Sequence, residues 1–344
     1  MELDKIIDFL KNYDGPQLKL MEVCGTHTSS IARSGIRGIL SQKIKLISGP
    51  GCPVCVTPAA YVDRCIDYSL KENHALVTFG DMMKVPGASG TLSAAKGRGA
   101  RVELMYSPFE TIGKAERNVE TIYVVAAVGF ETTAPAYALL VKEAKEKNIK
   151  NIRLVTALKT IAPALAWICE NEKAIDGFLC PGHVSVITGT AGYEALCEKY
   201  GRPFAIAGFE PEQILACVYD LAFGLSNGRR PEVHNLYKSA VKEGGNKKAQ
   251  EVMAECYMEG DAMWRGIGTI ENSGLYLSKR YAEYDGGSFG LNEDLGLPEG
   301  CRCGDVIVGR ISPDECPMFG RGCSPENPVG PCMASSEGAC GVWR

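Results

Sequence analysis

The sequence lacks the features that mark several common classes of protein. No stretch approaches the ~20 apolar residues of a membrane-spanning helix, and the apolar run 122–130 fits a buried strand. The start, Met1-Glu-Leu-Asp-Lys, has neither the basic nor the apolar region of a signal peptide. Lysine and arginine are scattered singly, and the formal net charge is -4. We therefore expect a cytoplasmic protein that binds neither membrane nor nucleic acid.

Common catalytic motifs are also missing. The sequence contains no P-loop, no G-x-G-x-x-G dinucleotide fingerprint, no G-x-S-x-G elbow and no Cys-x3-Cys-x2-Cys motif. Cysteine, by contrast, is abundant, with 15 in 344 residues. A chain of this length builds hydrophobic cores without the disulfide framework that is typical of small secreted domains. Metal binding or redox chemistry is therefore the better interpretation of the cysteines.

Short β-rich runs alternate with helical patterns through the first two thirds of the chain, which predicts parallel sheets covered by helices. Residues 1–118 and 119–232 are expected to form two Rossmann-like α/β domains. Residues 233–344 are expected to form a third, helix-rich domain with a Cys-rich iron–sulfur segment and helices over Leu236–Gly244 and Lys247–Met258. The predicted strands are Leu18–Val23, Ile44–Ser48, Ala75–Phe79, Arg101–Leu104, Thr121–Val128, Ile152–Ala157, Gly177–Leu179 and Phe204–Ala207.

Several predicted strands end in a Gly-containing polar loop that leads into a helix. Ligands of open α/β sheets bind just beyond the carboxyl ends of the strands, so these loops are expected to converge on one rim. The loops are Cys24-Gly-Thr-His, Gly49-Pro-Gly-Cys-Pro-Val-Cys, Gly80-Asp-Met-Met, Gly129-Phe-Glu-Thr-Thr and Cys180-Pro-Gly-His-Val-Ser.

The last 29 residues contain four cysteines, Cys316, Cys323, Cys332 and Cys340. Five prolines and five glycines from Ser312 onward argue against regular structure there, so something other than a hydrophobic core must order this tail. Four thiolates can hold a [4Fe–4S] cluster. Structural zinc usually takes tight Cys-x2–4-Cys pairs, which these four lack, and free or disulfide-paired thiols are the third alternative. Cys301 or Cys303, just upstream, could replace one of the four.

Three further cysteines lie in loops near the start of the chain. Cys52-Pro-Val-Cys55 is placed at a strand–helix junction, where a helix N-terminus lowers the pKa of a thiol. We interpret the pair as a reversible dithiol, compatible with part of a metal site; inert structural cysteines are the alternative. Cys24 and His27 lie three residues apart on an expected first helical turn, so both could act on one bound atom.

Two other polar residues occupy similar loops. His183 in Pro-Gly-His-Val-Ser has the same setting as His27, although a lone histidine is often simply a packed one. Glu131 presents a carboxylate at a helix start, where a capping role competes with ligand binding. The remaining cysteines fall mostly among apolar or helical neighbours, where free cysteine behaves as a small hydrophobe. We assign no chemistry to this group, Cys65, Cys169, Cys180, Cys197, Cys217 and Cys256.

Several of these motifs together resemble the HypD family of [NiFe]-hydrogenase maturation proteins. Each motif alone is weak, but all of them in this order are highly specific, they span nearly the whole chain, and none departs from the family pattern. The motifs are Cys24-Gly-Thr-His-Thr, Gly49-Pro-Gly-Cys-Pro-Val-Cys, Gly129-Phe-Glu-Thr-Thr, Pro181-Gly-His-Val-Ser, Glu315-Cys-Pro-Met-Phe-Gly and Gly330-Pro-Cys-Met-Ala-Ser-Ser-Glu-Gly-Ala-Cys.

The resemblance implies three α/β domains and a scaffold on which iron acquires its cyanide and carbon monoxide ligands, as Fe(CN)2CO. The implied partners are a HypC-type small chaperone and a HypE-type cyanide donor. Cys24 would be an iron ligand shared with a partner cysteine, and Cys52 and Cys55 would bind iron or change redox state. Cys316, Cys323, Cys332 and Cys340 would hold the [4Fe–4S] cluster.

A mechanism follows as a hypothesis. The cluster would pass electrons to the dithiol, whose reduced form would help Cys24 hold the iron, while His27 donates a hydrogen bond or a proton. Such a protein is a metallocofactor-assembly scaffold with redox activity more than an enzyme of ordinary turnover. The competing hypothesis is an iron–sulfur thiol–disulfide oxidoreductase resembling ferredoxin–thioredoxin reductase, which leaves the Cys24-Gly-Thr-His loop unexplained. A zinc-stabilised scaffold without redox activity ranks third.

Overall fold

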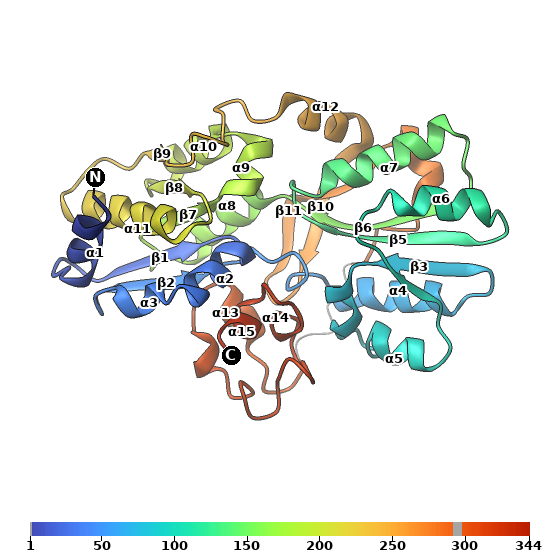
Figure 1. Cartoon of the computed structure of the whole chain (residues 1–344), viewed down its shortest axis with the longest axis horizontal. Coiled ribbons are helices and arrows are strands. Elements are labelled where there is room, and N and C mark those ends of the chain that lie inside the picture. The colour runs from blue at the N-terminus through green and yellow to red at the C-terminus, as the bar shows by residue number, and fades with distance from the viewer. Residues whose placement is uncertain (1, 292–297) are drawn as a thin grey trace.

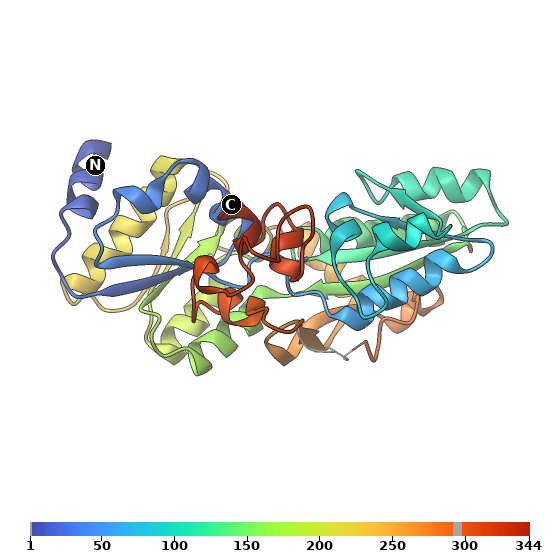
Figure 2. The same ribbon diagram turned by 90° about the horizontal axis from the view of Figure 1, so that it is seen from below.

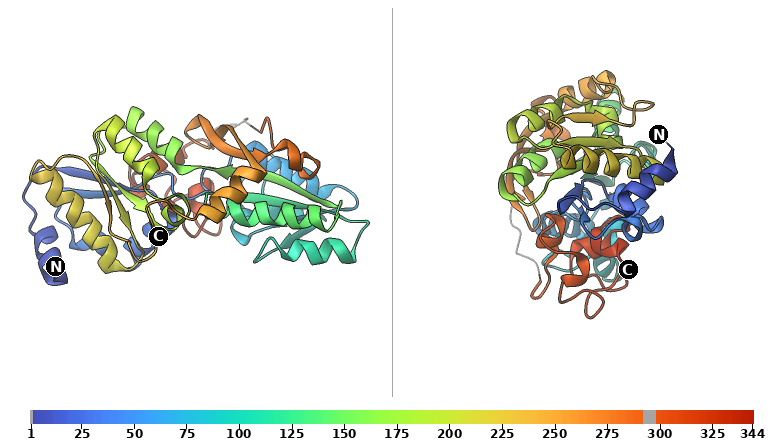
Figure 3. Two further views of the ribbon diagram at one scale, coloured as in Figure 1. Left: turned by 90° about the horizontal axis from the view of Figure 1, so that it is seen from above. Right: turned by 90° about the vertical axis from the view of Figure 1, so that its left-hand side faces the viewer.

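Two β-sheets form the opposite ends of an elongated molecule (Figure 1). The computed structural model describes residues 2–291 and 298–344. Seen from below, the C-terminal segment lies at the middle of the long axis, between the two sheets (Figure 2). Helix α12 (Lys247–Cys256) bridges the sheets on the opposite side of the molecule (Figures 1 and 3). The centre of the molecule is thus built from segments that are remote in sequence.

The first sheet has five parallel strands in the order β2-β1-β7-β8-β9. They are β1 (Leu18–Glu22), β2 (Ile44–Ser48), β7 (Gly177–Pro181), β8 (Phe204–Ala207) and β9 (Val233–Asn235). One face packs on α1 (Leu3–Lys11), α2 (Gly25–Arg33), α3 (Ile36–Ile39) and α11 (Pro211–Ser226). The other packs on α8 (Ile161–Asn171), α9 (Gly182–Thr188) and α10 (Ala191–Tyr200). Burial on both faces explains why β7 and β8 read as continuous apolar runs.

The second sheet has six strands in the order β10-β11-β6-β5-β3-β4. They are β3 (His74–Thr78), β4 (Val102–Leu104), β5 (Ile122–Gly129), β6 (Ile152–Lys159), β10 (Tyr257–Trp264) and β11 (Gly268–Leu277). Strands β3 to β6 are parallel, and β10 and β11 add an antiparallel hairpin. One face packs on α6 (Glu110–Arg117), α7 (Ala134–Glu146) and the end of α12, the other on α4 (Ala59–Leu70) and α5 (Leu92–Gly97).

The remaining elements are short. Three are 3-10 turns, η1 (Gly80–Lys84), η2 (Lys279–Tyr284) and η3 (Pro313–Glu315). Three are helices of four or five residues in the C-terminal segment, α13 (Cys303–Ile307), α14 (Pro331–Ala334) and α15 (Ala339–Val342). This segment packs into the core of the first sheet through Val306, Ile307 and Met333, among others.

All eight predicted strands are present, and the prediction of two sheets is confirmed, with the difference that the second sheet is only mostly parallel. The sheets do not follow the consecutive segments 1–118, 119–232 and 233–344, however. Strands β1 and β2 join the first sheet, whereas β3 and β4 join the second. The chain first crosses between the sheets in the loop 49–58, which carries Cys52 and Cys55, and it returns through α8.

The region after residue 233 departs most from expectation, because it contributes strands β9, β10 and β11. The helix predicted over Leu236–Gly244 is wrong. There the Asn235 side chain accepts from the Tyr237 N–H at 3.0 Å and donates to the Val241 carbonyl at 2.9 Å, so local side-chain bonds stabilise a turn. The second predicted helix ends at Cys256 and continues directly as β10.

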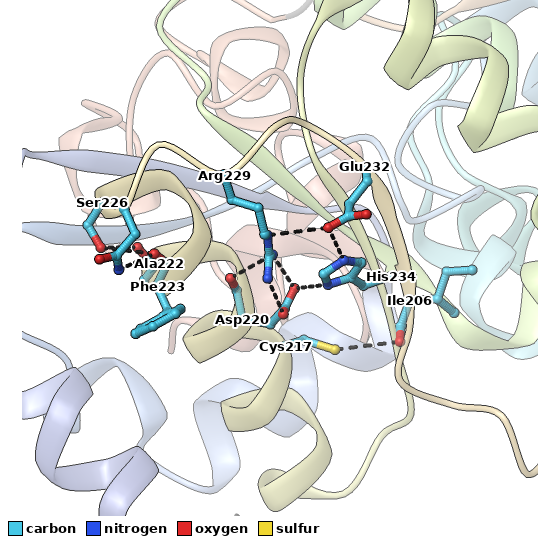
Figure 4. Close-up of polar contacts among 10 residues, drawn as sticks. Ile206, Cys217, Asp220, Ala222, Phe223, Ser226, Arg229, Glu232 and His234 are labelled. Atoms are coloured by element: carbon cyan, nitrogen blue, oxygen red, sulfur yellow. Dashed lines mark hydrogen bonds and ion pairs between the residues drawn. The ribbon is translucent and has the colours of Figure 1, made fainter.

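Edge strand β9 is fastened to α11 by a charged network (Figure 4). The two ring nitrogens of His234 lie 2.6 Å from a carboxylate oxygen of Asp220 and 2.7 Å from one of Glu232. Arg229 donates to both oxygens of Asp220, at 3.0 and 2.9 Å. The network explains His234 as a structural residue. No helix in the described part of the chain is long and apolar enough to cross a membrane.

Candidate functional site

The carboxyl ends of strands from both sheets face one cavity of about 340 Å³. The loop after β1 contributes Cys24, the loop after β5 contributes Thr132, and α9 contributes His183. Asp81 of η1 lines the second-sheet side, and Glu337 enters from the C-terminal segment. The prediction that the strand-end loops converge is confirmed, with the addition that they come from two sheets instead of one.

Cys24 is the residue just before α2, and its backbone is extended. Its N–H donates to Oε2 of Glu22 at 3.2 Å, and its side chain is buried. Burial raises the pKa of the Cys24 thiol to about 12, with a further increase from the nearby Glu22. The free thiol is therefore protonated at neutral pH, and a metal ion that binds it must displace the proton.

Glu22 is a buried acid beneath the Cys24 loop that the sequence analysis missed. Its Oε1 accepts from the Thr28 hydroxyl at 2.6 Å, so the carboxyl ties the end of β1 to α2. Burial raises the pKa of Glu22 to about 7. A glutamate at the end of the short strand Leu18–Glu22 is the only signal that the sequence carried.

The Cys24 loop and the dithiol loop are in direct contact. The Gly25 N–H donates to the Gly51 carbonyl at 3.2 Å. A Cβ on Gly51 would lie 2.2 Å from the backbone nitrogen of Cys24, so only glycine allows this approach. Cys24 and the pair Cys52 and Cys55 are thereby held on adjoining turns of backbone.

Cys52 and Cys55 are buried within a tight turn, where the Cys55 N–H donates to the sulfur of Cys52 at 3.4 Å. Helix α4 begins only at Ala59, after Pro58, so neither thiol sits at its N-terminus. Burial raises the pKa of Cys55 well above its ordinary value, with further increases from Cys52, Cys303 and Cys340. The expected lowering of thiol pKa by a helix dipole is therefore wrong for Cys55.

Of the two histidines that were predicted to act at the site, His183 lines the cavity and His27 does not. His27 is fully buried, and its Nε2 donates to the Gly208 carbonyl at 2.8 Å in the tautomer this contact requires. Burial lowers the pKa of His27 to about 4, so the ring is neutral and ties α2 to the loop after β8. His183, stacked on Phe209 with ring centroids 4.0 Å apart, is the imidazole that lines the cavity with Cys24.

Glu131 lies just outside the cavity. Its Oε1 accepts from the Ile161 N–H, the first residue of α8, at 2.9 Å. Burial raises the pKa of Glu131 to about 7. The geometry favours the capping interpretation over ligand binding, although the helix that is capped is α8 and not the one that follows Glu131 in sequence.

The C-terminal segment bridges the two sides of the cavity. The Thr26 hydroxyl donates to Oε1 of Glu337 at 2.9 Å, and the Ser335 hydroxyl donates to Oδ2 of Asp81 at 2.9 Å. Burial lowers the pKa of His183, and the nearby Glu337 carboxylate partly offsets that lowering. The sequence analysis gave Glu337 no role, and the structure places it in the lining of the cavity with Cys24.

Six cysteines of the C-terminal region form two neighbouring groups. Cys332 and Cys340 lie with their sulfurs 3.1 Å apart, and Cys303 and Cys340 raise the pKa of Cys332. A Cβ on Gly338 would lie 3.0 Å from the sulfur of Cys55, which places this first group against the dithiol loop.

The second group comprises Cys301, Cys316 and Cys323. Backbone amides donate to two of their sulfurs, from Arg302 to Cys316 at 3.5 Å and from Val329 to Cys323 at 3.3 Å. Burial raises the pKa of Cys301 to about 12, and Cys303, Cys316 and Cys323 contribute to its electrostatic surroundings.

The thiols of this region are the ligand type that an iron–sulfur cluster takes. In residues 2–291 and 298–344, no three His, Cys, Asp or Glu side chains are arranged to hold one metal ion. The side chains present are thiols, and amides already donate to the sulfurs of Cys316 and Cys323, as in the hydrogen bonding that tunes such clusters. The six cysteines that were assigned no chemistry, by contrast, are all buried in the apolar clusters on which the sheets pack.

Fold and site define a class: a two-sheet α/β protein in which one strand-end thiol lines a cavity, a dithiol loop contacts that thiol's loop, and further thiols of the C-terminal segment lie against the dithiol loop. Over residues 2–344 the chain matches the family model "HypD: Hydrogenase formation hypA family", and it belongs to that family. It is 38% identical over 330 residues to the hydrogenase maturation factor HypD of Escherichia coli, covering 95% of this chain and 88% of that protein.

Two further relatives show the same breadth. The HypD hydrogenase maturation factor of Azotobacter vinelandii is 40% identical over 338 residues, which cover 95% of this chain and 89% of the relative. A putative hydrogenase expression/formation protein of Methanocaldococcus jannaschii is 36% identical over 346 residues, covering 99% of this chain and 95% of the relative. The similarity therefore extends over both sheets and the C-terminal segment.

Proposed function

We propose that this protein acts in hydrogenase maturation as the scaffold on which an iron ion receives cyanide and carbon monoxide, giving the Fe(CN)2CO group. Family membership supports the process, and the contact between the Cys24 loop and the dithiol loop supports the chemistry. Iron here is the cargo, delivered and later passed on.

Cys24 is the proposed ligand for that iron, because it is the thiol that lines the cavity between the sheets. Thiolate is a strong ligand for soft low-valent iron. The cavity also contains His183, Asp81 and Glu337, which can bind or release the protons that iron binding displaces. His27, held by the Gly208 carbonyl, acts on the position of α2 and not on the cargo.

Cys52 and Cys55 are the proposed redox dithiol. Closing the pair to a disulfide releases two electrons and two protons, and opening it consumes them. The first C-terminal thiol group reaches this pair through Gly338, which offers a route for electrons between the C-terminal segment and the strand-end loops. The reduced pair then supplies thiols beside Cys24 while the diatomic ligands are added.

A [4Fe–4S] cluster is the proposed resident cofactor, and when bound it would supply electrons one at a time. The contacts favour Cys301 in the ligand set together with Cys316 and Cys323. The fourth ligand then comes from Cys332 or Cys340, and the other remains with Cys303 beside the dithiol. This assignment replaces one of the four ligands expected from the sequence.

The proposed partners are a HypC-type small chaperone, which provides a second cysteine to the iron, and a HypE-type cyanide donor. We propose that the complex works in the cytoplasm. The cavity has walls from both sheets and from the C-terminal segment, so a partner that reaches Cys24 contacts parts of the chain that are distant in sequence.

Infrared spectroscopy of the protein purified anaerobically with its chaperone tests the scaffold, because bound cyanide and carbon monoxide absorb where polypeptide does not. We expect bands that are lost in Cys24→Ala and retained in Cys197→Ala, a control in α10. An iron-replete, cluster-containing complex without such bands would instead support the thiol–disulfide oxidoreductase, for which the contact between the first C-terminal group and Cys55 is the favouring observation.

A further inference from the structure

A second cavity, of about 380 Å³, lies at the open edge of the first sheet and shares no lining residue with the Cys24 cavity. Its walls come from β2, from residues 306–315 and from Trp343 near the C-terminus. Strand β2 is the last strand of its sheet, so no other described strand covers its outer edge. The ribbon shows α3 and β2 beside the C-terminal segment (Figure 1).

The lining of this edge cavity is strongly cationic although the whole chain carries a net charge of -4. It includes four basic side chains, Lys19, Arg37, Lys45 and Arg310, against the single carboxylate of Glu315. Lys19 and Lys45 are register partners on adjacent strands and therefore emerge on the same face of the sheet. Two like charges placed side by side favour a bound anion between or above them.

The basic residues differ in how far they are already neutralised. Arg310 is paired with Glu172 at 2.7 Å and with Asp305 at 3.4 Å. Lys19, Arg37 and Lys45 form no salt bridge within the part of the chain that the structure describes, although Glu22 interacts electrostatically with Arg37 and Glu315 with Lys45. These cations are thus at most partly neutralised, whereas Arg310 is already paired.

Two buried donors on one wall have no acceptor. The Arg37 guanidinium lies 4.9 Å over the Trp343 ring, and its Nε donates to the Leu46 carbonyl at 3.4 Å. Nη2 of Arg37 and Nε1 of Trp343 are both buried without a hydrogen-bond partner among the described residues. Leaving such a group unpaired costs about 1–3 kcal/mol. Acceptor oxygens in the cavity would remove that cost.

The free edge of β2 adds backbone donors. The ladder to β1 uses the Lys43 carbonyl and the Gly49 amide, and alternate residues of a parallel strand bond to the same neighbour. The amides of Leu46 and Ser48 therefore face the open edge, which agrees with the contact between Arg37 and the Leu46 carbonyl. The edge therefore presents amides together with carbonyls, and the Leu46 carbonyl is already bonded to Arg37.

We propose that this edge cavity binds a compact polyanion that carries phosphate or carboxylate oxygens. The planar fork of Arg37 matches two such oxygens at once, and Lys19 and Lys45 neutralise the remaining charge. Arg37 and Trp343 come from opposite ends of the chain, so the ligand fastens the C-terminal segment to α3 and β2.

Calorimetric titration of the full-length protein with pyrophosphate, and separately with citrate, tests the site at one fixed ionic strength. We expect one saturable site, weakened at least tenfold in both Arg37→Gln and Lys45→Gln. Arg98→Gln is the matched control, since it removes one exposed positive charge on the second sheet's side of the molecule. The tighter of the two anions identifies the class of oxygen.

Three outcomes would overturn the proposal: no saturable binding of either anion, affinities unchanged in both cavity variants, or an equal loss in Arg98→Gln. Lys45 is exposed on an edge strand, so Lys45→Gln remains informative even if Arg37→Gln disturbs folding. The result is independent of the iron scaffold, because no residue of the edge cavity lines the site around Cys24.

Discussion

The thiols at the strand ends and the thiols of the C-terminal segment are positioned by different means. Cys24 follows a five-residue strand and precedes a nine-residue helix, so regular backbone fixes its location. The C-terminal thiols sit among helices of four or five residues and one 3-10 turn. Their location depends on contacts with the rest of the protein, since such short elements are not stable alone.

The comparison shows which of the two regions tolerates substitution. At the strand ends, close backbone approach at Gly51 leaves no freedom, and one added atom should disrupt the site. In the C-terminal segment, a few side-chain hydrogen bonds and the proposed cofactor together fix the position of the backbone. Changes there should act locally and leave both sheets intact.

The largest effect is expected from Gly51→Ala. Its Cβ would meet the backbone of Val23 and Cys24 at 2.2 to 2.5 Å, and backbone cannot yield as a side chain can. We expect a loss of about 3 kcal/mol in the free energy of unfolding, measured with urea, together with loss of iron loading. Gly97→Ala, whose new Cβ would meet no atom within 4 Å beyond its chain neighbours and its own helix backbone, should be no less stable than the wild type. An unchanged midpoint for Gly51→Ala would show that the two loops can separate.

A smaller and more local effect is expected when the proposed cluster is removed by an iron chelator. The segment after residue 298 should then become roughly tenfold more sensitive to protease, because its ordering free energy falls. Circular dichroism should show that the two sheets persist. Mass spectrometry of the fragments locates the cuts, and cleavage within β5 or β7 instead would contradict the separation of the two regions.

The strand-end region can also be tested through pH. The pKa of Glu131 is raised from 4.5 to about 7, so the folded protein binds more protons there than the unfolded chain between those values. Stability from this group is present below pH 4.5 and is lost as pH rises toward 7. Glu131→Gln keeps an acceptor for the Ile161 N–H and removes the charge.

In urea unfolding at several pH values, Glu131→Gln should therefore gain stability relative to the wild type as pH rises from 4.5 to 7. The expected slope of the difference is at most about 1.4 kcal/mol per pH unit. Glu120→Gln, an exposed position, is the control and should show no such slope. A flat difference for Glu131→Gln would mean that the carboxyl is charged and solvated in the folded protein.

The sequence predicted the strand-end region better than the C-terminal segment. The eight strands and the polar loops that follow them could be predicted from the sequence, because apolar runs and Gly-containing turns are local signals. The difference between His27, which is buried, and His183, which lines the cavity, was not readable, since it depends on the loop after β8, which supplies the Gly208 carbonyl and the Phe209 ring. Only the folded sheet brings that loop to α2.

The grouping of the C-terminal thiols was only partly readable for a related reason. The spacing led us to predict Cys316, Cys323, Cys332 and Cys340 as cluster ligands, with Cys301 or Cys303 as a possible replacement, and that ligand set stays a prediction. The structure adds that Cys301 lies near Cys316 and Cys323, and that Cys332 and Cys340 lie close to each other. In an irregular segment the sequence separation of two residues says little about their distance in space.

The smallest effect is expected from Ser335→Ala, which removes the hydrogen bond that its hydroxyl donates to Asp81 and the one that it accepts from the Glu337 N–H at 3.2 Å. The cost should be about 1 kcal/mol for each hydrogen bond. It should fall on the segment alone, because Glu337 still accepts from Thr26 on the other side. Hydrogen exchange should then show faster exchange in 331–342 with unchanged protection of β5 and β7. Ser93→Ala, an exposed serine of α5, is the matched control. If Ser335→Ala instead loosened both sheets, the bridge would support the cavity as a whole, and the contrast between rigid strand ends and an independently ordered segment would fail.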